Sequence, residues 1–109
     1  KNIKKLKSTS LDYLMSKHKQ YACICKANMC SACFTLEESG ELQKIKDTLD
    51  RHKIPYSVRE CRDNSENYAL LMSTGTSKVP CVIYISNGSF QVTSIEEFQD
   101  MCKRFKWEN

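Results

Sequence analysis

The stretch of residues 79–85 and the turn that follows it place the strongest constraint on what this chain can fold into. Valine, isoleucine and tyrosine dominate the stretch, and these side chains favour a buried strand. Asn87-Gly88 comes just after it and is the dipeptide that two-residue hairpin turns favour, because both residues adopt positive φ angles readily. The sequence therefore predicts that residues 90–92 return antiparallel to this strand.

Two further strands are expected earlier in the chain, each separated from the next strand by a helical pattern. Residues 21–25 form an apolar run that predicts a strand buried on both faces, and residues 56–61 alternate as a second strand. Strands that alternate with helices pair in parallel through right-handed crossovers. We therefore expect the strands over residues 21–25, 56–61 and 79–85 to be parallel. The predicted fold is α/β, with a mixed four-stranded sheet and helices on both faces.

Start signals and apolar periodicity mark the expected helices. The cap candidates are Ser10 or Thr9 for a helix over residues 11–17, Asn64 or Ser65 for a short helix, and the capping box Ser94-Ile95-Glu96-Glu97 for the last helix. A longer helical pattern runs from residue 30 to about residue 53, and Gly40 within it predicts a bend, because glycine costs about 1 kcal/mol relative to alanine in a helix. Leu11, Leu14 and Met15 share one face of the first helix, and the short helix carries Tyr68, Leu71 and Met72. In the longer pattern Phe34, Leu42, Ile45 and Leu49 recur at helical spacing, with Phe34 expected in the core. The residues of the last helix that are expected to face inward are Ile95, Phe98, Met101, Cys102 and Phe105.

Length and charge limit the organisation and the partners of the chain. The 109 residues are expected to form one domain, with a basic lead-in and first helix over residues 1–19 and a core over residues 20–106. The net charge is +4, and four lysines stand in the first seven residues, so the chain lacks the basic stripe of a nucleic-acid binder. This basic lead-in is expected to be solvated, with contact to an acidic partner surface as the alternative.

The apolar runs are too short to cross a bilayer, and polar residues 8–10 stand where a signal peptide needs an apolar stretch. We therefore expect a monomer with no membrane or nucleic-acid partner.

Seven cysteines are the most unusual part of the composition. Their odd number prevents complete internal pairing, and four of them lie between residues 23 and 33. A reducing compartment, the cytoplasm, is therefore the simpler expectation, with one functional pair and several inert thiols. Cys23, Cys25 and Cys102 are expected to be small buried residues, and Cys61 an inert thiol at the end of a strand.

Cys30 and Cys33 stand where a buried strand gives way to a helix. A sulfur at a helix N-terminus faces unpaired backbone N–H groups and the positive end of the helix dipole, which lowers a cysteine pKa from about 8.5 toward about 7. Cys33 lies three residues further along the same face, at a Cα separation of about 5–6 Å that permits a disulfide. This predicts redox chemistry, with Cys30 attacking a substrate disulfide and Cys33 resolving the mixed disulfide.

Two alternatives remain for these cysteines. One is a zinc or iron–sulfur site with Cys23, Cys25, Cys30 and Cys33 as ligands. The chain lacks a second CxxC or an HxxxH pattern, so we expect no metal. The other alternative is a pair of structural thiols without chemistry.

The succession of strand, CxxC motif, long helix, and Val79-Pro80 opening a strand that ends in Asn87-Gly88 resembles the thioredoxin-like superfamily. The resemblance covers about residues 21–105. It implies a thioredoxin-like fold and a thiol–disulfide oxidoreductase that acts on protein disulfides and is recycled by another thiol system. It implies no cofactor beyond the redox-active disulfide, with glutathione as an optional partner.

The resemblance also implies roles for residues around the motif. Pro80 would be a cis-proline packed beside the disulfide, and Val79 would offer its backbone to bound substrate. Met29 stands where thioredoxins carry a tryptophan, and Lys26 stands near a lysine of glutaredoxins, so both are expected to face substrate. Ile24 occupies roughly the place of the buried aspartate of thioredoxins, which leaves proton transfer at Cys33 without its usual acceptor.

Two readings remain open for the branch of the family and for Cys81. A glutathione-dependent reductase is the alternative to a protein disulfide reductase, although the Gly-Gly segment by which glutaredoxins bind glutathione has no match at residues 91–97. Cys81 follows Pro80 and is expected to fill a slot where family members often carry threonine. The alternative is a third thiol that forms a disulfide with Cys33 or Cys30.

Overall fold

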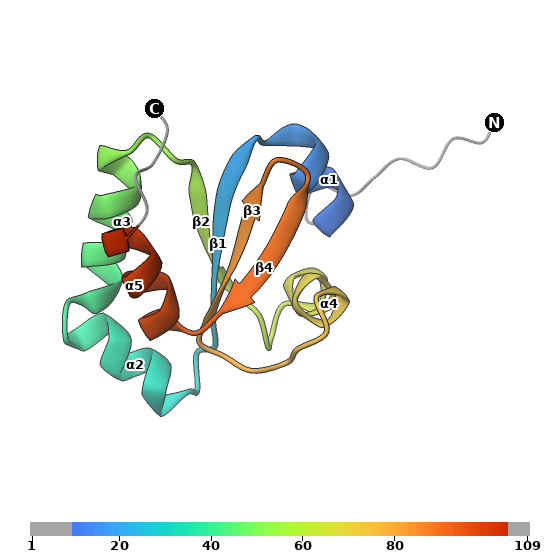
Figure 1. Ribbon diagram of the computed structural model, residues 1–109. Coiled ribbons are helices and arrows are strands. Elements are labelled where there is room, and N and C mark those ends of the chain that lie inside the picture. Colours follow the sequence, from blue (N-terminus) through green and yellow to red (C-terminus); the bar gives the residue numbers. More distant parts are fainter. Residues whose placement is uncertain (1–9, 105–109) are drawn as a thin grey trace.

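The computed structural model describes residues 10–104, which form a sheet with helices packed around it (Figure 1). The expected lead-in of residues 1–9, including the cap candidate Thr9, and the expected core residue Phe105 lie outside the described residues. Within the described part, no helix has the length and apolar character that a membrane span requires. In chain order the elements are α1 (Leu11–Lys17), β1 (Gln20–Lys26), α2 (Ser31–Glu38), α3 (Glu41–Arg51), β2 (Tyr56–Glu60), α4 (Ser65–Ser73), β3 (Cys81–Ser86), β4 (Ser89–Thr93) and α5 (Ile95–Arg104).

The sheet has four strands in the order β2-β1-β3-β4. β1 pairs in parallel with β2, whereas β3 pairs antiparallel with both β1 and β4. β1 and β3 occupy the centre, and the five inner residues of β1 are all buried. The prediction of an α/β fold with a mixed four-stranded sheet is confirmed.

The expected parallel direction of the third strand is wrong. Cys81 opens β3 directly opposite Cys25, near the end of β1, so β3 starts at the edge of the sheet where β1 and β2 finish. α4 has nine residues and spans about 14 Å, and residues 74–80 bring the chain back to that same edge. A connection that starts and ends at one edge of a sheet gives an antiparallel strand.

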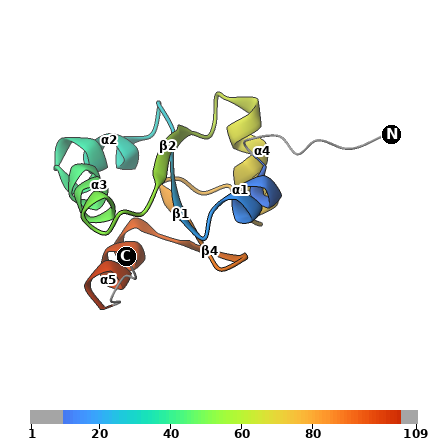
Figure 2. The ribbon, with the colours of Figure 1, turned by 90° about the horizontal axis from the view of Figure 1, so that it is seen from above.

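Helices cover both faces of the sheet, as expected. α2, α3 and α5 lie on one face, and α1 and α4 lie on the other (Figure 2). Alternate residues along β1 divide between two cores. Ala22 and Ile24 pack with α3 and α5, and Tyr21, Cys23 and Cys25 pack with α1 and α4.

The expected caps and turns form with the side chains that the sequence suggested. Ser10 Oγ accepts the backbone N–H of Tyr13 at 3.1 Å, and Asn64 Oδ1 accepts that of Asn67 at 3.0 Å. The capping box of α5 closes reciprocally, with distances of 2.8 and 3.1 Å between the Ser94 and Glu97 groups.

Positive φ angles occur at the turns where glycine was expected to matter. Asn87 and Gly88 have φ angles of 52° and 81°, as a hairpin of this type requires. Gly40 has a φ of 85°, so the expected bend is a complete break between α2 and α3.

The break at Gly40 explains why the prediction of Phe34 as a core residue is wrong. Phe34 is 63% exposed, because α2 is a separate helix that buries Cys33 and Leu36 instead. Phe34 and Leu42 would share a face only in one continuous helix, and the break between α2 and α3 changes the helical phase between them.

Tyr68 and Met72, two of the apolar residues that the short helix was expected to carry, are exposed at 42% and 46%. They stand one turn apart on a face of α4 that points away from the sheet, whereas Leu70 and Leu71 are buried. Cys102 and Met15 are partly buried against the two cores.

Candidate active site

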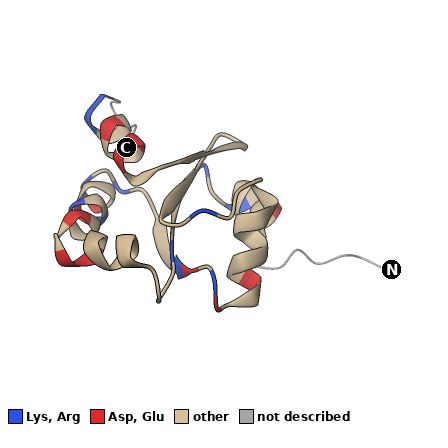
Figure 3. Ribbon diagram, turned by 90° about the horizontal axis from the view of Figure 1, so that it is seen from below, with Lys and Arg blue, Asp and Glu red and all other residues tan. Residues whose placement is uncertain are grey.

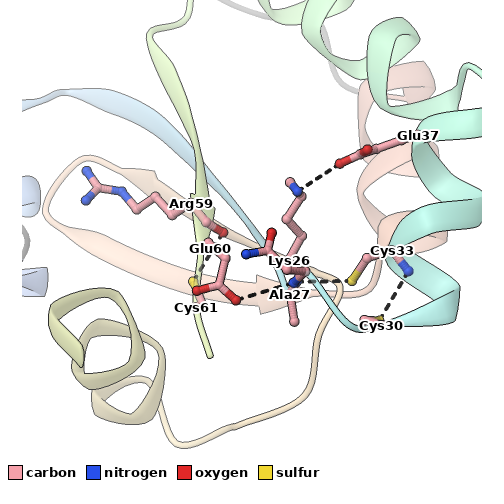
Figure 4. Close-up of polar contacts among 9 residues, drawn as sticks. Lys26, Ala27, Cys30, Cys33, Glu37, Arg59, Glu60 and Cys61 are labelled. Atoms are coloured by element: carbon pink, nitrogen blue, oxygen red, sulfur yellow. Dashed lines mark hydrogen bonds and ion pairs between the residues drawn. The ribbon is translucent and has the colours of Figure 1, made fainter. Parts of the chain in front are cut away.

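Cys30 stands at the N-cap of α2, directly after the loop that leaves β1 (Figure 4). Its backbone is extended, and its Sγ accepts the backbone N–H of Cys33 at 3.2 Å. A serine or aspartate oxygen accepts this hydrogen bond in most helices. The sulfur therefore occupies a position at which the backbone stabilises a negative charge.

The electrostatic surroundings favour the thiolate of Cys30. Partial burial opposes ionisation, but hydrogen bonds from the Cys33 thiol and from the backbone N–H groups of Cys33 and Ala32 outweigh it, together with the charge of Arg62. The pKa of Cys30 is consequently lowered from its ordinary value. α2 has no charged residue in its first turn, so the nearby charges come from other segments (Figure 3).

Cys33 has the opposite character, although it is only three residues away. Its side chain is 1% exposed, and its Sγ accepts the backbone N–H of Ala27 at 3.3 Å. Burial raises the pKa of Cys33 to about 11, and the interaction with Cys30 adds to this rise, while the Ala27 N–H and the charge of Lys26 oppose it. The two thiols are therefore chemically distinct, one poised to ionise and the other held neutral.

An ion pair lies close to Cys33. Lys26 Nζ and a Glu37 carboxylate oxygen are 2.8 Å apart, and Glu37 follows Cys33 by one turn of α2 (Figure 4). This pairing with Glu37 raises the pKa of Lys26. Ile24 is fully buried within the core that α3 and α5 cover, so it supplies no polar group to Cys33.

Glu60, at the end of β2, ties the loop before Cys30 to the loop after β2, and sequence reasoning missed it. Its carboxylate accepts four backbone N–H groups, those of Asn28 at 3.4 Å, Arg62 at 3.2 Å, Asp63 at 2.7 Å and Asn64 at 3.0 Å. Desolvation is the largest single influence and raises the pKa of Glu60, but the four hydrogen bonds together outweigh it, so the pKa is lowered. The sequence does show an acidic residue at the end of a strand, just before a capped helix. This pattern does not reveal that the same carboxylate also binds Asn28.

The residues expected to face substrate differ in solvent exposure. Met29 is 92% exposed in the loop just before Cys30. Val79 and Pro80 are half-buried and precede β3, which begins at Cys81 and not at Val79 as expected. The peptide bond between Val79 and Pro80 is cis.

Cys81 faces the side of the sheet that α1 and α4 cover. It is 4% exposed and packs in one core with Cys23, Cys25 and Cys61, whereas Cys33 is not part of that core. Its cross-strand partner is Cys25, so the structure directs the third thiol toward β1. Within residues 10–104, no group of three or more histidine, cysteine, aspartate or glutamate side chains is arranged to hold a metal ion.

Comparisons with known proteins place this geometry in a known fold. A scan against models of protein families and a search of curated proteins find no match for the chain. Among solved structures, the thioredoxin of Plasmodium falciparum matches with a TM-score of 0.59 at 14% identity, over 90% of this chain and 96% of that one. The solution structure of the oxidised thioredoxin from the same organism matches at 0.58 and 11%, over 88% and 92%. Thioredoxin O2 from Arabidopsis thaliana, in its oxidised state, matches at 0.55 and 14%, over 80% and 76%. The chain therefore has a thioredoxin-like fold.

Proposed function

We propose that this chain is a thiol–disulfide oxidoreductase that acts on protein disulfides, with Cys30 as the nucleophile and Cys33 as the resolving thiol. The observation that carries the proposal is the 3.2 Å hydrogen bond from the Cys33 N–H to Cys30 Sγ at the start of α2. It supports a reactive thiolate at the partly exposed cysteine, next to a buried thiol that stays protonated.

The reaction proceeds in two exchanges. The Cys30 thiolate attacks one sulfur of the substrate disulfide, the substrate S–S bond breaks, and the departing thiolate takes a proton from solvent. Cys33 then loses its proton and attacks Cys30 Sγ, which releases the second substrate thiolate and leaves a Cys30–Cys33 disulfide. The substrate gains two electrons, and a second thiol system returns two electrons to the protein.

The surface around the motif supports a protein as substrate. Met29 and Phe34 flank the two cysteines in sequence and expose 92% and 63% of their surface, which gives apolar contacts for residues beside a substrate disulfide. We assign Val79, Pro80 and Lys26 to the same substrate face. The ammonium of Lys26 is paired with Glu37, so an anionic ligand such as glutathione would have to compete with that carboxylate.

The proposal is tested by measuring the reduction of a protein disulfide by the enzyme, with each electron donor supplied in a separate assay. Cys30→Ser should abolish reduction, because a hydroxyl does not ionise near neutral pH. Cys33→Ser should accumulate a covalent enzyme–substrate mixed disulfide, because only the second exchange is lost. Cys102→Ser is the matched control and should behave like the unmodified chain. Full multiple turnover by the Cys33→Ser variant would show the assignment to be wrong.

Two donor systems run in parallel decide how the enzyme is recycled. Turnover that requires a dithiol reductase supports the protein disulfide reductase, and turnover that requires glutathione and glutathione reductase identifies the glutathione-dependent alternative.

A further inference from the structure

Four cysteines outside the CxxC motif converge on one face of the sheet. Cys23 and Cys25 lie on β1, Cys61 directly follows β2, and Cys81 opens β3. All four belong to the core beneath α1 and α4, with exposures of 0% for three of them and 4% for Cys81. The proposed disulfide exchange uses none of these thiols.

Cys25 is at the centre of this cluster, but its three neighbours differ in geometry. Cys81 is its direct partner across the antiparallel β1–β3 pair, and such partners have Cα separations of about 4.5–5.5 Å, within the range that a disulfide needs.

Cys23 has a sulfur 3.9 Å from that of Cys25, but it stands two residues away on the same strand. That spacing separates the Cα atoms by about 6.8 Å, at the limit of disulfide geometry.

Cys61 is displaced by two residues from Arg59, the partner of Cys25 on β2. Neighbouring strands lie about 4.8 Å apart and two residues add about 6.6 Å along the strand, so the Cα atoms of Cys25 and Cys61 are about 8 Å apart, beyond the reach of a disulfide. Cys81 is therefore the one neighbour of Cys25 with favourable geometry.

The two thiols also differ in reactivity, which fixes the order of events. Cys25 raises the acidity of its partner, because its S–H stabilises a thiolate on Cys81 and lowers the Cys81 pKa against burial. The same contacts with Cys23, Cys61 and Cys81, together with burial, raise the pKa of Cys25. Cys81 is also the member of the pair with residual exposure, so an oxidant meets Cys81 first.

We propose that Cys25 and Cys81 form a second oxidisable dithiol, which hydrogen peroxide converts into a disulfide joining β1 to β3. The Cys81 sulfur attacks one peroxide oxygen, the O–O bond breaks, and Cys81 becomes a sulfenic acid as water leaves. The Cys25 thiol then attacks that sulfur and expels a second water. The two thiols lose two electrons and two protons, and one peroxide becomes two waters. Neither step involves Cys30 or Cys33, so the inference is independent of the proposed function.

The experiment uses the full chain carrying Cys30→Ser, Cys33→Ser and Cys102→Ser, which leaves four of the seven cysteines. The protein is treated with hydrogen peroxide, unfolded in an alkylating agent, digested with trypsin and mapped by mass spectrometry. We expect the free thiols to fall from four to two, with peptide 20–26 linked to the peptide that begins at Val79. Removal of Cys102 is necessary because it shares that second tryptic peptide with Cys81.

Single substitutions in this background assign the sulfur atoms. Peptide 20–26 carries both Cys23 and Cys25, so Cys25→Ala should abolish the link, whereas the matched control Cys23→Ala should retain it. Cys61→Ala should also retain it. Four thiols still free after peroxide treatment, or a link that survives Cys25→Ala, would overturn the proposal.

A second measurement uses the chain with all seven cysteines, so the test does not depend on the folding of the triple-serine variant. In the otherwise unmodified chain, peroxide should remove four free thiols. In its Cys25→Ala variant it should remove two or three, because a sulfenic acid on Cys81 then has no Cys25 thiol with which to form a disulfide. Equal losses in these two proteins would overturn the inference as well.

Discussion

The pH dependence of the second exchange is a sensitive test of the two-thiol mechanism. Burial raises the pKa of Cys33 to about 11, so at pH 7 only about one Cys33 side chain in ten thousand is a thiolate. The resolving step needs that thiolate, and its rate should rise about tenfold for each pH unit, or about a hundredfold between pH 7 and pH 9. The first exchange should level off at a lower pH, because the pKa of Cys30 is lowered.

Formation of the mixed disulfide does not remove this dependence. Once Cys30 is bonded to substrate, its own hydrogen bond and charge no longer act on Cys33. Burial remains, and it is the largest cause of the raised pKa. The rise in rate should therefore persist at least to pH 9.

An aromatic disulfide that releases a coloured thiolate separates the two exchanges in a rapid-mixing experiment. One equivalent of colour reports attack by Cys30, and a second equivalent reports resolution by Cys33. Cys33→Ser should remove the second phase and keep the first. Lys26→Met should make the second phase slower than in the unmodified chain, because the Lys26 charge favours the Cys33 thiolate. A second phase whose rate stays constant from pH 7 to pH 9 would refute the assignment of Cys33 as a buried, protonated resolving thiol.

The remaining predictions concern stability and are measured by urea or thermal unfolding. Gly40→Ala should lower the free energy of unfolding by about 1–2 kcal/mol, because Gly40 has a φ of 85° with open space at the Cβ position, so only backbone strain acts. Phe98→Ala should cost about 3–5 kcal/mol, whereas Phe34→Ala should stay within about 0.5 kcal/mol, because Phe98 is fully buried and Phe34 is 63% exposed. Similar losses for the two phenylalanines would contradict this assignment of the core. Peroxide-treated protein with a Cys25–Cys81 disulfide closes a loop of 57 residues and should be more stable by about 4 kcal/mol, a gain that a reductant reverses.

Local signals in the sequence predict most of the secondary structure. Ser10, Asn64 and Ser94 cap their helices because an N-cap depends on a side chain and a backbone only a few residues apart. The turn at Asn87 and Gly88 is local in the same sense. For the same reason the placement of Cys30 at a helix start could be predicted from the residues around it.

Features that depend on three-dimensional placement could not be predicted in this way. The direction of β3 depends on where residues 74–80 return the chain relative to the other strands, and the alternation of strands and helices along the sequence does not indicate that place. The contact between Glu60 and Asn28 joins residues 32 positions apart, so neither position reveals the other. The exposure of Phe34 depends on whether one helix continues past Gly40. A bend would leave Phe34 on the same face as Leu42, whereas the complete break at Gly40 does not.

The environments of the cysteines explain why the two proposed redox pairs should differ in their properties. Cys30 ionises readily because a helix start supplies backbone N–H groups that no helical hydrogen bond uses. Cys25 lies in the central strand of the sheet, where the ladder uses the backbone N–H groups, so its sulfur contacts mainly other thiols. The first pair therefore has a nucleophile ready for exchange, whereas the second reacts only when an oxidant reaches a buried site. Peroxide should accordingly oxidise Cys30 and Cys33 first and join Cys25 to Cys81 later, an order that the thiol count over time would reveal.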